Sequence, residues 1–91
     1  MNTIYKYSFQ TTDSLEIEMP SNSEVLTVQI QYGIPTMWAL VDTESKIVKK
    51  KFRICGTGHK ITKEDLERFL YVGTYQLSEG RLVFHLFEIL P

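Results

Sequence analysis

The strongest constraint on the fold is an alternation of apolar and polar residues that recurs in short runs along the whole chain. A side-chain period of two is the pattern of a β-strand with one buried face. Turn residues bound seven such runs, at 3–9, 15–19, 24–31, 34–42, 47–55, 69–77 and 82–90. The sequence therefore predicts a mainly β (α+β) protein: a compact antiparallel β-sandwich or partly open barrel of about seven strands with one short helix.

The clearest hairpin is predicted around Tyr32-Gly33, which separates two runs rich in β-formers. A two-residue turn there pairs Gln31 with Ile34 and gives the hairpin two different faces. The face predicted to be core carries Leu26, Val28 and Ile30 opposite Ala39, Met37 and Pro35. The other face is mixed and carries Thr27, Gln29 and Gln31 opposite Trp38, Thr36 and Ile34.

Two more hairpins are predicted, one near each end of the chain. The run at 3–9 is expected to pair with the run at 15–19, because the residues between them are polar and include Asp13. The last hairpin is expected to turn at Glu79-Gly80. Its predicted register places Thr74 opposite His85, Val72 opposite Phe87 and Gln76 opposite Val83.

A short helix is predicted between the fifth and sixth runs. Thr62 is a suitable N-cap, and Glu64 and Asp65 then lie in the first turn, where the helix dipole favours acidic side chains. The helix is expected to end at Arg68, and its apolar positions are Leu66, Phe69 and Leu70.

Composition indicates one domain, residues 1–91, with enough apolar residues (43%) for a core. The single cysteine excludes an internal disulfide framework. The N-terminal residues alternate instead of forming the apolar run of a signal peptide, and no apolar run is long enough to span a bilayer. These features predict a soluble protein of the host-cell cytoplasm with no membrane partner.

Positive charge is concentrated in one segment, Lys46–Lys63. It holds seven of the ten Lys and Arg residues and no Asp or Glu, so it contributes +7 to a chain with a net charge of −1. An uncompensated basic segment of this kind favours an anionic partner.

Several short motifs occur together along the chain. They are Met19-Pro20, Val28-Gln29, Gln31, Trp38-Ala39-Leu40-Val41-Asp42, Phe52-Arg53, Gly56-Thr57-Gly58-His59, Gly73-Thr74, Gln76-Leu77, Val83-Phe84-His85 and Phe87-Glu88. In this combination the sequence resembles an uncharacterised group of short proteins encoded by bacteriophages and bacterial genomes and classed as a domain of unknown function. The resemblance implies a phage or prophage setting, but no activity and no site. The chain departs from the group at the lysines 49–51 and at 62–68, where the group has a shorter loop rich in Pro or Asp.

Within the basic segment, Gly56-Thr57-Gly58 is predicted to let successive backbone N–H groups point into one concavity, a nest suited to phosphate. Basic side chains lie before and after this loop. If the phosphate belongs to a nucleotide, its base also needs an aromatic side chain on which to stack. The predicted ligand-binding residues are Lys49, Lys51, Arg53, Gly56, Thr57, Gly58, His59, Trp38 and Gln29. In the alternative interpretation the glycines only form a turn, and the lysines are solvated or paired across strands with Glu16 or Glu18.

No catalytic or metal-binding motif is present. Cys55 and His59 are spaced as two metal ligands, but a third and fourth are not evident. His85 lies in an apolar run and is predicted to be a core histidine bonded to Thr74. We therefore expect no enzyme activity, no cofactor and no metal.

The sequence favours a non-enzymatic phage-type accessory protein that binds a phosphate-bearing small ligand, a nucleotide signal, and so counters host antiviral defence. A deep pocket in so small a domain requires a subunit interface, so a homodimer or larger homo-oligomer is expected. One alternative is a protein–protein inhibitor of a host defence enzyme or complex. The second alternative is nucleic-acid binding by the basic strand.

Overall fold

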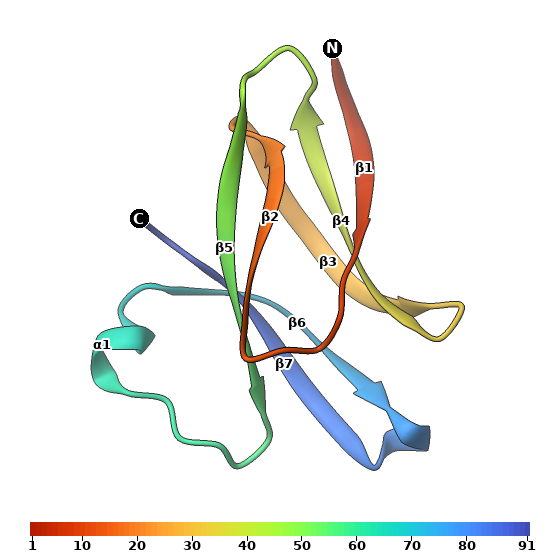
Figure 1. Ribbon diagram of the computed structural model, residues 1–91, viewed down its shortest axis with the longest axis vertical. Helices are drawn as coiled ribbons and strands as arrows, with labels where there is room; N and C mark the ends of the chain where they lie inside the picture. The colour runs from red at the N-terminus through yellow and green to blue at the C-terminus, as the bar shows by residue number, and fades with distance from the viewer.

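Two antiparallel sheets pack against each other in the computed structural model, which describes residues 1–91 (Figure 1). The first sheet has the order β1 (Asn2–Ser8), β4 (Ile34–Asp42), β3 (Ser23–Gln31). The second has the order β2 (Ser14–Pro20), β5 (Ile47–Gly56), β7 (Leu82–Ile89), β6 (Phe69–Leu77). A short helix α1 (Lys63–Leu66) precedes β6, and a 3-10 turn η1 (Ser78–Gly80) joins β6 to β7. The predicted fold class is confirmed, and the two sheets do not close into a barrel.

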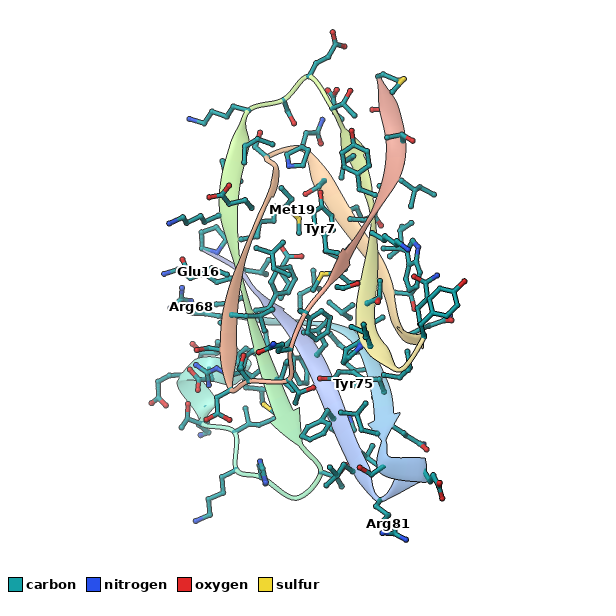
Figure 2. The ribbon with its side chains drawn as sticks, turned by 45° about the vertical axis from the view of Figure 1, so that its right-hand side comes forward. Tyr7, Glu16, Met19, Arg68, Tyr75 and Arg81 are labelled. Carbon is teal, nitrogen blue, oxygen red and sulfur yellow. The ribbon has the colours of Figure 1, made fainter.

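The core lies between the inner faces of the two sheets. Met37 of the first sheet and Phe52 and Leu86 of the second are fully buried, as their alternation within the strands predicts. Figure 2 shows Met19 and Tyr75 among the side chains between the sheets. Each large apolar side chain buried in this way stabilises the fold by about 1.5–3 kcal/mol. No helix is long or apolar enough to cross a membrane.

The predicted hairpin at Tyr32-Gly33 is confirmed, with Gln31 opposite Ile34. Both turn residues have positive φ, 52° and 78°, the pairing that matches the twist of two-residue hairpins. The predicted position of Leu26 in the core is wrong. A β-bulge shifts the register so that Val25, not Leu26, lies opposite Ala39, and Leu26 is 45% exposed.

The predicted first hairpin is wrong, because β1 and β2 belong to different sheets. β1 pairs with β4, and β2 pairs with β5. The residues between them cross from one sheet to the other: the Phe9 N–H donates to Pro35 O, and Asp13 O accepts from the Ile54 N–H. Alternation identified both strands but carries no information about their partners.

The last hairpin has the predicted pairs Thr74–His85 and Gln76–Val83, but Tyr71, not Val72, lies opposite Phe87. A bulge before Gly73 causes this shift. At Gly73 a Cβ atom would lie 2.8 Å from Val28 Cγ1, so the glycine lets β6 approach β3 closely. The edges of the two sheets meet there.

The helix has the predicted N-cap, because Thr62 Oγ1 accepts a hydrogen bond from the Asp65 N–H at 3.1 Å. It ends at Leu66 and not at Arg68, and none of its residues is buried. Leu66 is exposed, and Phe69 begins β6 instead of extending an apolar helix face.

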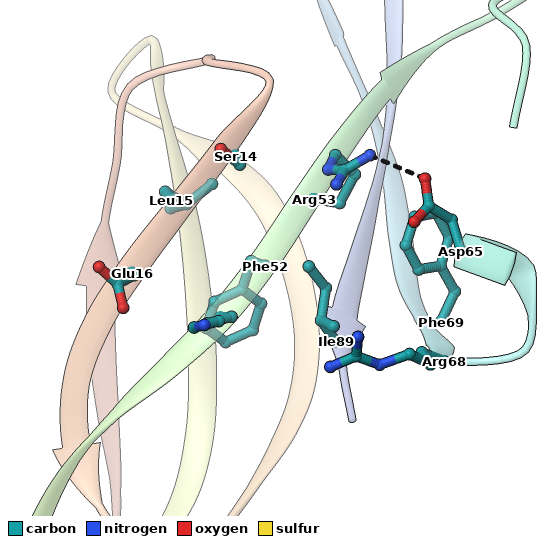
Figure 3. A pocket seen from close by; sticks show the side chains of 10 residues that line it. Ser14, Leu15, Glu16, Phe52, Arg53, Asp65, Arg68, Phe69 and Ile89 are labelled. Carbon is teal, nitrogen blue, oxygen red and sulfur yellow. Dashed lines mark hydrogen bonds and ion pairs between the residues drawn. The ribbon is translucent and has the colours of Figure 1, made fainter. Parts of the chain in front are cut away.

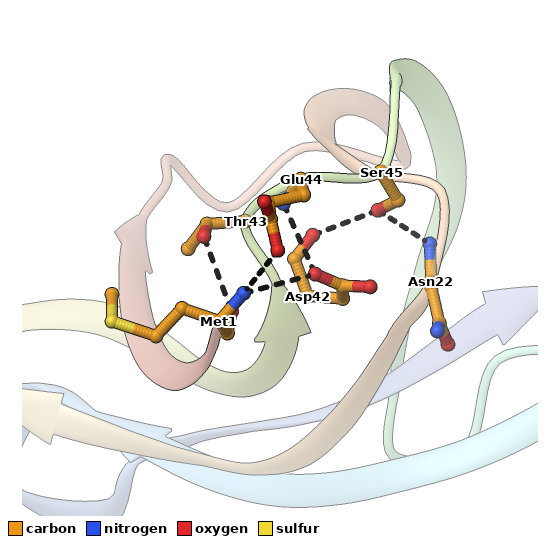
Figure 4. A network of polar contacts seen from close by, with 6 residues as sticks. All are labelled: Met1, Asn22, Asp42, Thr43, Glu44 and Ser45. Atoms are coloured by element: carbon orange, nitrogen blue, oxygen red, sulfur yellow. Dashed lines mark hydrogen bonds and ion pairs between the residues drawn. The ribbon is translucent and has the colours of Figure 1, made fainter.

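Polar contacts fix the turn between β4 and β5 and tie it to the first residue (Figure 4). The Met1 amino group lies 2.9 Å from a Glu44 carboxylate oxygen, and this hydrogen bond raises the pKa of the amino group. The Glu44 N–H donates to Asp42 Oδ1 at 3.0 Å and lowers the pKa of that carboxyl. Ser45 Oγ accepts from the Asn22 N–H. The start of the basic strand β5 is therefore held in a defined turn.

Candidate anion-binding site

β5 divides the basic segment between the two faces of the second sheet. Phe52 and Ile54 point into the core, so Lys49, Lys51 and Arg53 project from the outer face. Lys50 shares the inner face but lies near its rim. There its Nζ is 3.8 Å from a Glu88 carboxylate oxygen and donates to Ser23 O at 3.3 Å.

A hollow of about 510 Å³ lies on the outer face of the second sheet, beside the segment that follows α1 (Figure 3). We call it the first hollow. Its lining residues are Ser14, Leu15, Glu16, Lys51, Phe52, Arg53, Asp65, Arg68, Phe69 and Ile89. It therefore brings together three cationic side chains, two carboxylates and two aromatic rings from β2, from β5 and from the segment 65–69.

Arg53 is the most firmly held cation of the first hollow. Its Nη1 lies 3.2 Å from Asp65 Oδ2, and its Cζ lies 5.7 Å from the centre of the Phe69 ring. Because Thr62 caps α1 through the Asp65 N–H, the capping bond also places the carboxylate that pairs with Arg53. The guanidinium is held between a carboxylate and a ring.

A second hollow of about 530 Å³ adjoins the first. Its lining residues are Ser21, Val48, Lys49, Lys50, Lys51, Arg68, Glu88, Ile89, Leu90 and Pro91. Lys51, Arg68 and Ile89 line both hollows. The Arg68 side chain donates from Nε to Leu90 O at 3.2 Å, which anchors it at the boundary between them.

Most cations of the basic segment have no carboxylate within ion-pair distance. Of its seven, only Lys50 and Arg53 form ion pairs. The register nevertheless places Glu16 opposite Lys51 and Glu18 opposite Lys49, so these acids lie next to the lysines on the same face. The outer face is thus partly compensated, with exposed ammonium groups that remain free to bind an anion.

The glycine loop has a different geometry from a phosphate nest. The Thr57 N–H donates to Val83 O at 3.1 Å, and the His59 N–H donates to Gly56 O at 3.0 Å. A phosphate nest at Gly56, Thr57 and Gly58 needs a row of free backbone N–H groups. The two hydrogen bonds occupy N–H groups of this loop, so that row is not present. Gly58, with φ of +90°, makes the turn. Neither hollow described above includes this loop.

Trp38 and Gln29 lie on a different sheet from the predicted cations Lys49, Lys51 and Arg53. Both belong to the first sheet and alternate with the buried Met37 and Val28, so they project from its outer face. Lys51 and Arg53 project from the outer face of the second sheet. The structure therefore does not bring the predicted aromatic and polar ligands together with the predicted cations.

His85 is the centre of a chain of hydrogen bonds on the second sheet. The predicted bond to Thr74 is confirmed, at 2.9 Å from Nδ1, and Thr57 Oγ1 lies 2.8 Å from Nε2. The predicted place in the core is wrong, because His85 is only partly buried and does not belong to the buried cluster. The Tyr71 hydroxyl extends the chain to Thr74. Both ring nitrogens of His85 are therefore occupied by hydroxyl groups of the protein.

Cys55 is buried, and burial raises the pKa of its thiol. A raised pKa keeps the sulfur protonated at neutral pH, the opposite of an activated nucleophile. No group of three or more His, Cys, Asp or Glu side chains is arranged to hold a metal ion.

Sequence reasoning missed Arg68 and Phe69 as site residues. The helix pattern makes Arg68 the last residue of the predicted helix and places Phe69 on its apolar face. β6 pairs with β7, and β7 pairs with β5, so this long-range pairing is what brings Arg68 and Phe69 to the hollow that Arg53 lines. No local sequence pattern predicts it.

Residues 1–90 match a family described as a domain of unknown function, DUF7352. The chain belongs to the DUF7352 family. The match includes all seven strands and α1, so both outer faces are parts of the DUF7352 domain. Neither a curated protein nor a solved structure shows significant similarity to the chain.

Proposed function

We propose that this DUF7352 protein is a non-enzymatic, phage-type accessory protein that binds a phosphate-bearing small ligand, a nucleotide, in the first hollow. The convergence of Lys51, Arg53 and Arg68 around one hollow carries the proposal. These side chains come from β5 and from the segment after α1, and they outnumber the two carboxylates, Glu16 and Asp65, that line the same hollow.

The donors of the hollow suit a phosphate group. Lys51 is exposed and has no ion-pair partner, and Arg68 uses only Nε in a hydrogen bond to the protein. Charge-assisted bonds from such groups to phosphate oxygens are about twice as strong as neutral ones. The two carboxylates of the hollow, Glu16 and Asp65, disfavour an anion unless the cations compensate them.

In this proposal the Arg53 guanidinium, which lies over the Phe69 ring at 5.7 Å, turns toward the phosphate and leaves that ring face, in place of the distant Trp38, for a base. Phe69 stacks on Phe87 with ring centres 4.9 Å apart, and the Tyr71 ring is tilted against Phe87 at 5.7 Å. Stacking of a base on an aromatic side chain contributes about 1–3 kcal/mol. A first hollow of about 510 Å³ lies within the usual size range of small-molecule sites.

Sequestration of a host nucleotide signal, and hence protection against antiviral defence, is the use that we propose for this binding. It rests on the sequence resemblance to short phage-encoded proteins. It rests also on the composition of the site, whose cations and aromatic ring suit binding and include no group that we assign to catalysis. The phage setting and the identity of the nucleotide are parts of the proposal.

Calorimetric titration tests the proposal. The purified protein is titrated at low salt with inorganic pyrophosphate, cyclic dinucleotides and ADP-ribose-derived nucleotides. We expect at least one nucleotide to bind, and Lys51→Glu to weaken that binding about tenfold or more, since a hydrogen bond to a charged group is worth about 1.5–3 kcal/mol.

Lys46→Glu is the matched control. It makes the same change in charge at an exposed position outside both hollows. Equal losses of affinity from the two substitutions would show that the effect depends on net charge alone and not on the first hollow. The absence of binding heat with every nucleotide in the panel would contradict the proposal.

Nucleic-acid binding is the second candidate, because the cations extend from the first hollow into the second along β5. It predicts an affinity for single-stranded DNA or RNA that falls steeply with salt. Binding of mononucleotides with little salt dependence, and none to oligonucleotides, would exclude it.

A further inference from the structure

One edge of β5 is open over part of its length. β2 pairs with β5 over residues 47–53, but β7 pairs with it only over residues 51–56. On the side of β7, residues 47–50 therefore have no neighbouring strand. Figure 1 shows β2 beside this part of β5 and the C-terminal residues leaving it on the other side. An open strand edge can pair with a further strand.

The backbone hydrogen bonds show which residues face the open edge. The Ile54 N–H donates to Asp13 O in the register of β2, so the even-numbered residues of β5 point their backbone groups toward β2. The odd-numbered residues therefore point theirs toward the side of β7. At Ile47 and Lys49 that side is the open edge, which leaves two N–H donors and two C=O acceptors without a neighbouring strand.

The second hollow lies along this edge. Residues 48–51 of β5 line it on one side, and residues 88–91 line it on another. The Leu90 N–H donates to Arg68 O at 2.8 Å, and Arg68 Nε donates to Leu90 O at 3.2 Å. These two bonds turn the chain beyond β7 toward Arg68 instead of along β5. The hollow of about 530 Å³ therefore gives an added chain access to the free backbone groups.

The charge of the second hollow is mainly positive. Four basic side chains line it, and its one acidic side chain, Glu88, pairs with Lys50. Lys49 and Lys51 have no carboxylate within ion-pair distance, and the glutamates opposite them on β2 compensate them from one side only. A second copy of β5 at this edge would bring lysines against lysines, which is unfavourable, whereas an acidic strand would be attracted.

We propose that the open edge of β5 binds an extended acidic peptide segment of a partner protein by strand addition. The peptide backbone pairs with Ile47 and Lys49, and acidic side chains at alternate positions lie beside Lys49 and Lys51 on the outer face of the sheet. A nucleic acid fits less well, because phosphodiester groups accept hydrogen bonds but donate none and would leave the two C=O groups unpaired. The inference needs no ligand in the first hollow and is independent of the proposed function.

Hydrogen exchange followed by NMR tests the strand addition. The probe is a short capped peptide in which glutamate alternates with threonine. In the free protein the amides of Val48 and Lys50, which face β2, are expected to be protected, and those of Ile47 and Lys49 to exchange quickly. Saturating peptide is expected to slow exchange at Ile47 and Lys49 about tenfold or more.

N-methylated peptides separate backbone pairing from charge. One version is methylated at the glutamate nitrogens and the other at the threonine nitrogens, so each lacks the donors of one edge of the peptide. One of the two is expected to bind about fivefold more weakly than the parent peptide, and the other to bind as the parent does. Equal binding by both versions would overturn strand addition.

Substitutions at Lys49 make the same separation on the protein. Lys49→Gln and Lys49→Pro both remove the charge, but only the proline removes the N–H at the open edge. Because that N–H faces away from β2, the strand is expected to tolerate the proline, and circular dichroism checks the fold. We expect the glutamine variant to bind the peptide about threefold more weakly and the proline variant about tenfold. If the proline variant does not fold, the N-methylated peptides test the same bond on the unsubstituted protein.

Three results would overturn the proposal. One is the absence of peptide-induced protection at Ile47 and Lys49. Another is equal binding of a control peptide in which lysine replaces glutamate. The third is a single-stranded oligonucleotide of equal charge that binds more tightly than the peptide and protects the same two amides, which would assign the edge to nucleic acid.

Discussion

Replacing Gly73 with alanine perturbs the place where the edges of the two sheets meet. The added Cβ would lie 2.8 Å from Val28 Cγ1 and 3.7 Å from the Val28 backbone nitrogen. Val28 is only 4% exposed, and its branched side chain has few rotamers to which it can turn. We expect β6 and β3 to be forced apart.

The magnitude follows from two opposing effects. Overpacking of a core costs about 1–3 kcal/mol. Alanine also reduces the freedom of the unfolded chain relative to glycine, which returns about 0.4–1 kcal/mol. The free energy of unfolding of the Gly73→Ala variant is therefore expected to fall by about 1–2 kcal/mol, and its Tm by roughly 5–15 °C.

Urea unfolding of the Gly73→Ala variant measures this loss, with Gly56→Ala as the control. At Gly56 a Cβ would lie 2.9 Å from the His59 ring, but that ring is exposed and can move, so a change within about 0.5 kcal/mol is expected. In a Val28→Ala background the clash at Gly73 disappears, and Gly73→Ala is expected to be neutral. Equal losses with and without the valine methyl groups would refute the reasoning.

Three further predictions concern β5 of the second sheet and the helix α1. Phe52→Ala removes a fully buried ring and is expected to cost about 3–5 kcal/mol in urea unfolding, enough to abolish cooperative unfolding in a domain of this size. Thr62→Ala is expected to cost about 0.5–2 kcal/mol and to broaden the amide resonance of Asp65, because the cap bond of α1 is lost. Burial raises the pKa of the Cys55 thiol, so alkylation at pH 7 is expected to be slow in the folded protein and fast in denaturant; equal rates would contradict this.

Local patterns in the sequence predicted the elements of the fold but not all of their partners. The Tyr32-Gly33 hairpin was predictable because a two-residue turn determines its register, and the Thr62 cap because it depends only on neighbouring residues. The position of β2 beside β5 was not predictable, since nothing in residues 10–13 shows that this link crosses from one sheet to the other. The bulge at Leu26 is also unmarked by any glycine or proline.

The candidate site was predictable only in part. The alternation along β5 placed Lys51 and Arg53 correctly on one outer face. Trp38 was assigned to the same site because it was a free aromatic residue, whereas it lies on the other sheet. Arg68 and Phe69 join the site through long-range pairing of β6 with β7, which a one-dimensional pattern does not record.

The most direct test of the account is to map the binding surface by NMR. Isotope-labelled protein is titrated with each nucleotide of the panel, and the amide shifts are assigned along the chain. The account predicts that the shifts of the strongest binder gather at Lys51, Arg53, Arg68 and Phe69, around the first hollow. Shifts confined to the loop at Gly56–Gly58 or to the face around Trp38, or no shifts with any nucleotide, would contradict it.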